Sequence, residues 1–175
     1  LFIFFYFFIL ISLLLSYLIF VLPKFQYVQE RLLSFLDPKT GDNYQSEKAS
    51  EAITNGGFFG KGIGEGTLNS RVPEAHTDYI ISVISEEFGA IIVIVIMAIF
   101  LIFAYQVLRK IYLEQNDQIK LILVGSISII LLQTFIHIGV NIRFLPTTGM
   151  TLPFLSYGGS SIINTAILSG IILNL

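Results

Sequence analysis

The sequence contains few charged residues and no cysteine. Charged residues make up 13% of the chain and apolar residues 54%, and the mean hydropathy is +0.80. Because about a quarter of the residues in soluble domains are charged, this composition excludes an ordinary soluble domain. The absence of cysteine excludes disulfides and thiolate metal sites within these residues. No block of basic residues indicates binding to nucleic acid.

Long apolar runs dominate the sequence instead. A helix that crosses about 30 Å of hydrocarbon needs roughly 20 apolar residues. Four runs meet this requirement, at residues 1–22, 88–108, 121–140 and 157–175. The last two runs contain polar residues, so we expect them to pack against protein. The sequence therefore predicts an all-α integral membrane protein, a polytopic helical bundle with four transmembrane helices.

The ends and the loops of the chain suggest its topology. The chain begins and ends within apolar runs, and the first run lacks a basic leader, so we interpret the chain as a fragment that starts with a span. Loop 109–120 holds more basic residues than loop 141–156, which places loop 109–120 in the cytoplasm. The long loop, residues 23–78, would then face outwards. A long loop without strong secondary structure tends to be functional.

The long loop contains a turn-forming segment at residues 37–43 and a glycine-rich segment, NGGFFGKGIGEG, at residues 55–66. A phosphate-binding loop would place Ser or Thr after the lysine, whereas Gly62 follows Lys61. Two interpretations stay open, a flexible surface loop and a backbone cradle for a bulky anionic ligand. The phenylalanines of this segment could enter the membrane interface.

Polar residues gather where the long loop meets the second apolar run. The sequence PEAHTD occupies residues 73–78, and its proline can start a helix. Helix capping accounts for one of its polar side chains. Glu86 and Glu87 border the apolar run, where acidic side chains are costly and usually functional. A simple interfacial position is the alternative for these two residues.

The third and fourth runs add further polar groups. Gln133 and His137 lie four residues apart on one helix face, where an interhelical hydrogen bond is the expected role, and a lone histidine makes a poor metal site. Residues 146–161, PTTGMTLPFLSYGGSS, bring free N–H groups to the start of the last run, where they would attract a phosphate or pyrophosphate. Close helix packing by small residues is the alternative. These features suit an enzyme and a transporter equally.

The segments at residues 56–66, 73–78, 86–89 and 145–161 together resemble the SEDS family (shape, elongation, division, sporulation), in order and in spacing. The PEAHTD form is more similar to division members than to elongation members. The resemblance implies that residues 1–175 are the C-terminal part of a single membrane domain. It also implies a peptidoglycan glycosyltransferase of the bacterial inner membrane, at the division septum, with loop 23–78 in the periplasm.

The implied reaction is polymerisation of lipid II, an undecaprenyl-pyrophosphate-linked substrate. Implied partners are a class B penicillin-binding protein transpeptidase, other membrane proteins of the division machinery, and membrane lipids. The family's essential aspartate corresponds to Asp78, although Tyr79 replaces the usual Phe. Asp78 would be the general base for the acceptor hydroxyl, and holding a divalent cation, Mg²⁺ or Mn²⁺, is the alternative. Because carboxylates with an ordinary pKa of about 4 are weak bases, the first role needs an elevated pKa or close positioning.

The same resemblance implies substrate-binding residues. Glu74 and His76 would orient Asp78 or the substrate. Cations and oriented N–H groups would stabilise the leaving pyrophosphate. The candidates for this role are Arg31, Lys61, Arg71, Ser156, Gly158, Gly159 and Ser160.

Three positions depart from the family's pattern: Thr148 stands in place of the usual Lys, His137 in place of Asn, and Arg143 in place of Gly. The missing Lys weakens the case for anion binding at that turn, and we hypothesise that Arg143 supplies the charge instead. A lipid II flippase would need polar residues throughout its spans, whereas here the acids gather at one mouth, which favours an enzyme. A noncatalytic division scaffold is the other alternative.

Overall fold

The computed structural model describes residues 2–36, 44–72 and 74–175. These residues form helices joined by turns and loops, as the sequence predicts. They separate into two compact units, Leu1–Asn43 and Tyr44–Leu175, and each is described by itself. The turn predicted at residues 37–43 and the proline predicted to start a helix, Pro73, lie outside the described residues.

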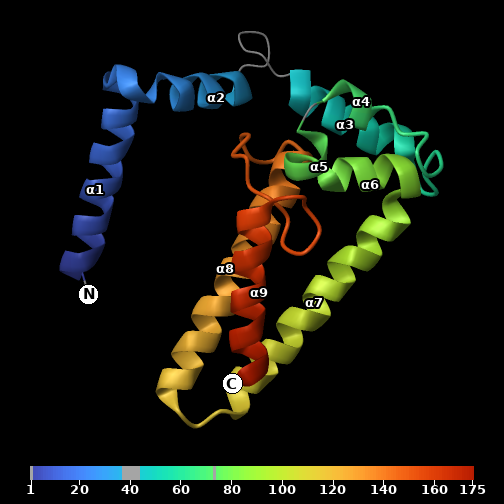
Figure 1. Ribbon diagram of the computed structural model, residues 1–175. Coiled ribbons are helices and arrows are strands. Elements are labelled where there is room, and N and C mark those ends of the chain that lie inside the picture. The colour runs from blue at the N-terminus through green and yellow to red at the C-terminus, as the bar shows by residue number, and fades with distance from the viewer. Residues whose placement is uncertain (1, 37–43, 73) are drawn as a thin grey trace. The chain divides into compact units, whose positions relative to one another are not determined.

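The first unit contains α1 (Phe2–Val21), η1 (Pro23–Phe25) and α2 (Gln26–Leu36), drawn in blue in Figure 1. α1 holds no charged residue. It ends before Leu22, whose backbone is extended at φ −87° and ψ 124°, because the proline that follows disfavours helical backbone. On α2, the guanidinium carbon of Arg31 lies 4.3 Å from the centre of the Tyr27 ring.

The second unit has two layers (Figure 1). The polar layer comprises α3 (Tyr44–Gly56), α4 (Leu68–Arg71), α5 (Ala75–Asp78) and α6 (Ile80–Phe88). The bundle comprises α7 (Ala90–Leu113), α8 (Asp117–Asn141) and α9 (Gly159–Asn174). The polar layer lies across one end of the bundle, and the α7–α8 connection lies at the other end (Figure 1).

Within the described residues, α7 and α8 are the helices long and apolar enough to cross a membrane, with hydropathies of 3.0 and 2.2. Only 17% of the apolar 18-residue stretch of α7 is buried, so most of the apolar side chains of this helix are available to lipid. α9 is apolar but has 16 residues, and the first unit offers a shorter apolar stretch, Phe5–Leu14. Two of the predicted runs thus form candidate membrane spans, and the four-span topology stays a prediction.

The second unit has two apolar cores, and both α6 and α8 contribute to each of them. The core that lies mainly in the polar layer combines alanines, such as Ala49, with larger side chains, such as Leu68 and Tyr79. The core that lies mainly in the bundle includes Phe100, Leu123 and Ile130. The segment between α8 and α9, residues 142–158, also enters the bundle core, because its Leu152 is 1% exposed and belongs to that cluster. Figure 1 shows this orange segment descending beside α9.

The expectation that loop 23–78 lacks strong secondary structure is wrong. Helices α2, α3, α4 and α5 occupy most of its described residues, because α3 and α4 bury small and apolar side chains against α6. The second apolar run also begins differently from the prediction, since Gly89 separates α6 from α7. Gly89 has a φ of 82°, and a Cβ there would lie 2.2 Å from the carbonyl oxygen of Phe58. Only glycine therefore fits this junction.

Candidate functional site

The predicted catalytic residue, Asp78, is the last residue of α5, a helix of 4 residues. This single turn is stabilised by backbone hydrogen bonds, because the N–H groups of Thr77 and Asp78 donate to the carbonyl of Glu74 over 3.1 and 3.0 Å. A helix of one turn has no following turn to occupy its last carbonyls, so these carbonyls need partners from elsewhere.

Those partners come from the C-terminal end of α8 and from segment 142–158. The three successive carbonyls of residues 76–78 each accept a hydrogen bond: His76 from the N–H of Tyr157 at 3.1 Å, Thr77 from the hydroxyl of Ser156 at 2.7 Å, and Asp78 from the amide of Asn141 at 3.1 Å. The backbone that carries Asp78 is therefore fixed by elements more than sixty residues away in the sequence.

Asn141 is the centre of this arrangement. Its side chain is fully buried, and its amide N–H groups donate to the carbonyls of Asp78 and, over 2.8 Å, of His137. Its oxygen accepts from the N–H of Ser82 at 3.2 Å and from the Ser82 hydroxyl at 2.7 Å. One amide thus ties α5, the first turn of α6 and the end of α8 together. Sequence analysis missed this residue, although it continues the four-residue spacing of Gln133 and His137.

Segment 142–158 also approaches the Asp78 side chain. Gly149, at φ 69°, lies so close that a Cβ on it would be 3.6 Å from Oδ2 of Asp78. The next residue is held from α8, because Nδ1 of His137 donates to the carbonyl of Met150 over 2.8 Å. Asp78 is half-buried, and this segment lies beside its carboxylate. The site is therefore a carboxylate on a fixed backbone at the polar-layer end of the bundle.

The shared helix face of Gln133 and His137 does point inwards, as predicted. The expected interhelical hydrogen bond is replaced by the bond from His137 to the segment 142–158. Among the described residues, Nε2 of His137 and Oε1 of Gln133 are buried without a hydrogen-bond partner.

Glu86 organises the other end of α6. It is 1% exposed, and its carboxylate accepts from Nζ of Lys61 at 2.8 Å and from the N–H groups of Thr67 and Leu68 at 3.0 and 2.9 Å. Burial alone would raise the pKa of Glu86, but the bonds from Lys61, Leu68 and Thr67 outweigh it and hold the pKa below its usual value. The buried Glu86 side chain thus links the glycine-rich segment and α4 to α6 through hydrogen bonds.

The contacts with α6 help to decide between the two interpretations of the glycine-rich segment, a flexible surface loop and an anion cradle. Lys61 and Gly62 donate their N–H groups to the carbonyls of Glu86 and Glu87 over 2.9 and 3.1 Å, so the segment is attached to α6 through its backbone. Gly60 makes this possible, since a Cβ there would lie 2.2 Å from the Glu87 carbonyl oxygen. These contacts show a packed segment, with its lysine paired to an acid.

The family model for the FtsW, RodA and SpoVE cell cycle proteins matches residues 2–175. The chain belongs to this family. It is 39% identical over 169 residues to a protein of Geobacter metallireducens named probable peptidoglycan glycosyltransferase FtsW, covering 94% of this chain and 45% of that protein. A protein of the same name from Caulobacter vibrioides is 40% identical over 154 residues, covering 86% and 39%.

A solved structure agrees with the family assignment. It was described as "Structural coordination of polymerization and crosslinking by a peptidoglycan synthase complex", and it matches with a TM-score of 0.69 at 26% identity. The match covers 94% of this chain and 46% of that chain. The chain therefore spans less than half the length of the family members it matches. The relatives' names agree with the predicted similarity to division members.

The structure explains one departure from the family's pattern. Arg143, where glycine is common, has a φ of 59°, a backbone conformation that favours glycine. The chain turns here at the end of α8: the N–H of Arg143 donates to the carbonyl of Val140, and the N–H groups of Phe144 and Leu145 both donate to the carbonyl of Gly139. Thr148, in place of the usual Lys, is exposed.

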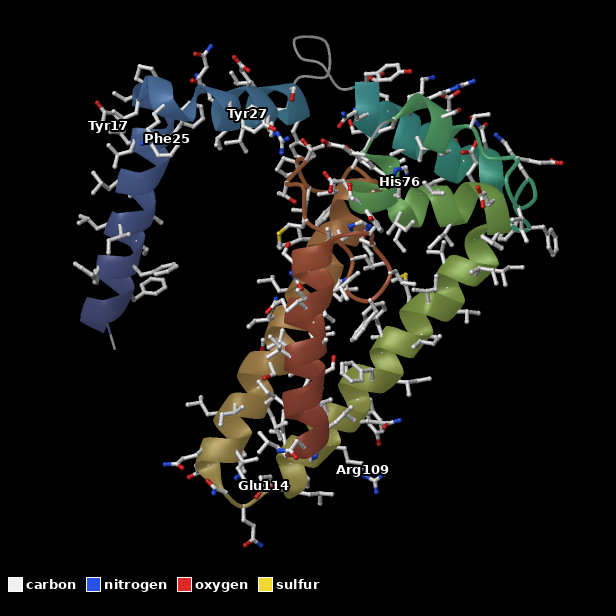
Figure 2. The ribbon with its side chains drawn as sticks, viewed as in Figure 1. Tyr17, Phe25, Tyr27, His76, Arg109 and Glu114 are labelled. Carbon is white, nitrogen blue, oxygen red and sulfur yellow. The ribbon has the colours of Figure 1, made fainter. Side chains whose placement is uncertain are left out.

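The remaining predicted site residues lie at several places in the structure. Ser156 and the start of α9 adjoin α5, with Gly158 and Gly159 at the helix start and Ser160 exposed in its first turn. Glu74 and His76 are exposed at α5, and Figure 2 labels His76 there. Lys61 pairs with Glu86, which lies near the C-terminal end of α6, whereas Asp78 precedes the start of that helix.

The other two predicted cations lie elsewhere. Arg71 is exposed at the end of α4 and, with Glu51 and Glu86, lines a small cavity between α3, α4 and α6. Arg31 lies in the first unit, over Tyr27. Within residues 2–36, 44–72 and 74–175, no three His, Asp or Glu side chains gather as metal ligands would.

Proposed function

We propose that the chain forms the C-terminal part of a peptidoglycan glycosyltransferase, which polymerises lipid II on the outer face of the bacterial cell membrane during division. Family membership and the names of the relatives support this activity. The observation that carries the proposal is the fixed backbone of α5, whose last three carbonyls are bonded by Asn141, Ser156 and Tyr157.

Asp78 acts as the general base in this proposal. Its carboxylate takes the proton of the acceptor sugar's 4-hydroxyl as that oxygen attacks the anomeric carbon of the donor. The bond from that carbon to the pyrophosphate oxygen breaks with inversion, and undecaprenyl pyrophosphate leaves with the electron pair. Since a carboxylate is a weak base, much of the rate comes from holding it in place, which the bonds to α5 accomplish. The N–H groups that begin α9, beside α5, are candidates to receive the pyrophosphate charge.

We also propose a topology and a partner. Residues 1–22, 88–108, 121–140 and 157–175 are the spans, loop 23–78 faces the periplasm, and the protein works at the septum. Figure 2 supports placing the site and loop 109–120 on opposite sides of the membrane. His76 lies at one end of the bundle, and Arg109 and Glu114 lie at the other. The matched peptidoglycan synthase complex, described by polymerization and crosslinking, supports a class B penicillin-binding protein as partner.

The test is lipid II polymerisation by the full-length protein with its transpeptidase partner, comparing wild type with Asp78→Asn. We expect the rate to fall by about 100-fold or more, because the variant keeps the shape and loses the base. Asp117→Asn, at the opposite end of the bundle with its side chain 95% exposed, is the matched control and should keep full activity. Undiminished polymerisation by Asp78→Asn would remove this residue from the mechanism. No polymerisation by the wild type would favour transport or scaffolding.

A further inference from the structure

The segment that connects α3 to α4 exposes three large apolar side chains. Phe58, Phe59 and Ile63 are 72%, 85% and 80% exposed. None of them belongs to either apolar core of the second unit. Three such side chains within six residues form an exposed apolar tip outside both cores. Exposed apolar side chains gathered in this way mark a surface that contacts a membrane or another protein.

This tip is held rigidly at the start of the membrane helix α7. The N–H groups of Ala90 and Ile91 donate to the carbonyls of Gly57 and Phe58 over 2.9 and 3.4 Å. Gly89 allows the two backbones to meet, as its position against Phe58 shows. In Figure 1 the connection between α3 and α4 lies beside the bend from α6 to α7. The tip therefore has a fixed depth along α7.

That depth is the boundary between water and hydrocarbon. Glu86 and Glu87 precede the bend, and α7 then runs without a charged residue from Ala90 to Leu108. A span without charges enters the hydrocarbon within its first turn, so a backbone bonded to Ile91 lies at the headgroup level. Apolar side chains at this level insert about 5–10 Å into the headgroup and acyl boundary.

We infer that Phe58, Phe59 and Ile63 anchor the polar layer in the lipid leaflet that surrounds the Ala90 end of α7. The attraction is apolar, because the lysine of this segment is paired with Glu86 and the exposed Glu65 would repel anionic lipids. The anchor holds the polar layer, and Asp78 with it, at the surface where lipid-linked molecules carry their headgroups. Binding therefore depends little on the anionic lipid fraction.

The experiment uses the full-length protein in vesicles of phosphatidylcholine, with a single cysteine at position 59 carrying an environment-sensitive fluorophore. Any cysteine outside residues 1–175 is first replaced. Position 47 on α3, an exposed Glu, is the water control, and position 101 near the middle of α7, an exposed Leu, is the deep lipid control. Quenching is measured with nitroxides near the headgroup, with nitroxides deep in the acyl chain, and with iodide in water.

We expect the label at position 59 to emit further to the blue than at position 47, to be quenched most by the shallow nitroxide, and to resist iodide. Position 101 should respond most to the deep nitroxide. Adding phosphatidylglycerol should leave the values at position 59 unchanged. Quenching by iodide as at position 47 would overturn the inference, and so would protection from both nitroxides and iodide, which would indicate a protein cover. A second label at position 63 must give the same pattern, and an unchanged melting temperature shows that the labelled proteins are folded.

Discussion

The polar layer and the bundle use their buried polar atoms in different ways. In the polar layer, buried groups join separate segments, as Glu86 joins α6 to α4 and as Ser82 joins α6 to Asn141. In the bundle, hydroxyls return to their own helix: Ser126, Thr134, Thr165 and Ser169 each donate to the carbonyl four residues earlier. Lipid offers no water to a polar atom, so a membrane helix satisfies its hydroxyls internally.

The polar layer therefore fixes the positions of its groups precisely, whereas the bundle is held together by packing. Bonds between distant segments fix a backbone position to within a hydrogen-bond length, which a catalytic carboxylate requires. Apolar packing holds the bundle together without specifying one polar geometry. The site lies where the layers meet, because Asn141 ends a bundle helix and bonds to the polar layer.

The largest effect should come from breaking the bond between the layers. Asn141→Ala removes the support of the Asp78 carbonyl, and a displacement of about 1 Å can cost about 100-fold in rate. We expect kcat to fall by this order with KM nearly unchanged, measured as lipid II polymerisation by the full-length complex. Asn141→Asp, which keeps the acceptor for Ser82 and loses the N–H donors, should not restore kcat. Asn164→Ala, exposed on α9, is the control. A normal kcat in Asn141→Ala would show that α5 is positioned without it.

Glu86→Gln should weaken the polar layer itself. The substitution removes the charge that Lys61 and two backbone N–H groups bond to, at a cost of about 2 kcal/mol in the free energy of unfolding. Thermal unfolding of the full-length protein in detergent measures this cost. Glu87→Gln, at the neighbouring half-buried position, should stay within about 0.5 kcal/mol. Equal melting temperatures for the two variants would contradict the role of Glu86.

The same residue predicts a dependence on pH. Its pKa is lower in the folded state than in the unfolded state, so its contribution to stability is present above the unfolded pKa, about 4.3, and is lost as the pH falls through the folded pKa. The melting temperature of the wild type should therefore fall more steeply below about pH 4.5 than that of Glu86→Gln. Parallel curves for the two proteins would argue against this pKa.

Two isoleucines of the bundle allow the contribution of a buried side chain to stability to be compared with that of a lipid-exposed one. Ile130 is fully buried, whereas Ile94 is 62% exposed on the surface of α7. Ile130→Val should lower the free energy of unfolding by about 1 kcal/mol, because it leaves a small cavity. Ile94→Val exchanges one lipid contact for another and should change it very little. Equal losses, measured by thermal unfolding, would show that other protein covers that face of α7.

Arg143 gives the smallest expected effect. Arg143→Gly relieves a backbone cost of about 1–2 kcal/mol and loses part of that gain, about 0.5–1 kcal/mol, to the entropy of the unfolded chain. We expect a net stabilisation of about 0.5 kcal/mol by thermal unfolding. If the arginine supplies charge to the site, Arg143→Gly and Arg143→Ala should both lose activity, although only the glycine variant gains stability. Normal activity in both would reject that hypothesis.

Several features were predicted from the sequence because they depend on local composition. The runs that become α7 and α8 are apolar over lengths that suit a bilayer, and the helices Ala90–Leu113 and Asp117–Asn141 contain most of these runs and extend beyond them. The glycine-rich segment, in contrast, is flexible or packed depending on what lies beside it. Gly60 shows the limit of sequence analysis, since its role depends on the Glu87 carbonyl that approaches it.

The sequence by itself determined the membrane class and the family, and it supplied the prediction of the aspartate at the candidate site, because these depend on contiguous residues and their spacing. The tertiary structure alone decided which groups hold that aspartate in place. Asn141 and Ser82 lie 59 residues apart in the chain, and Lys61 and Glu86 lie 25 apart. No local pattern encodes such pairs, because they form only when the packing of α3 to α9 brings the two segments within hydrogen-bond distance.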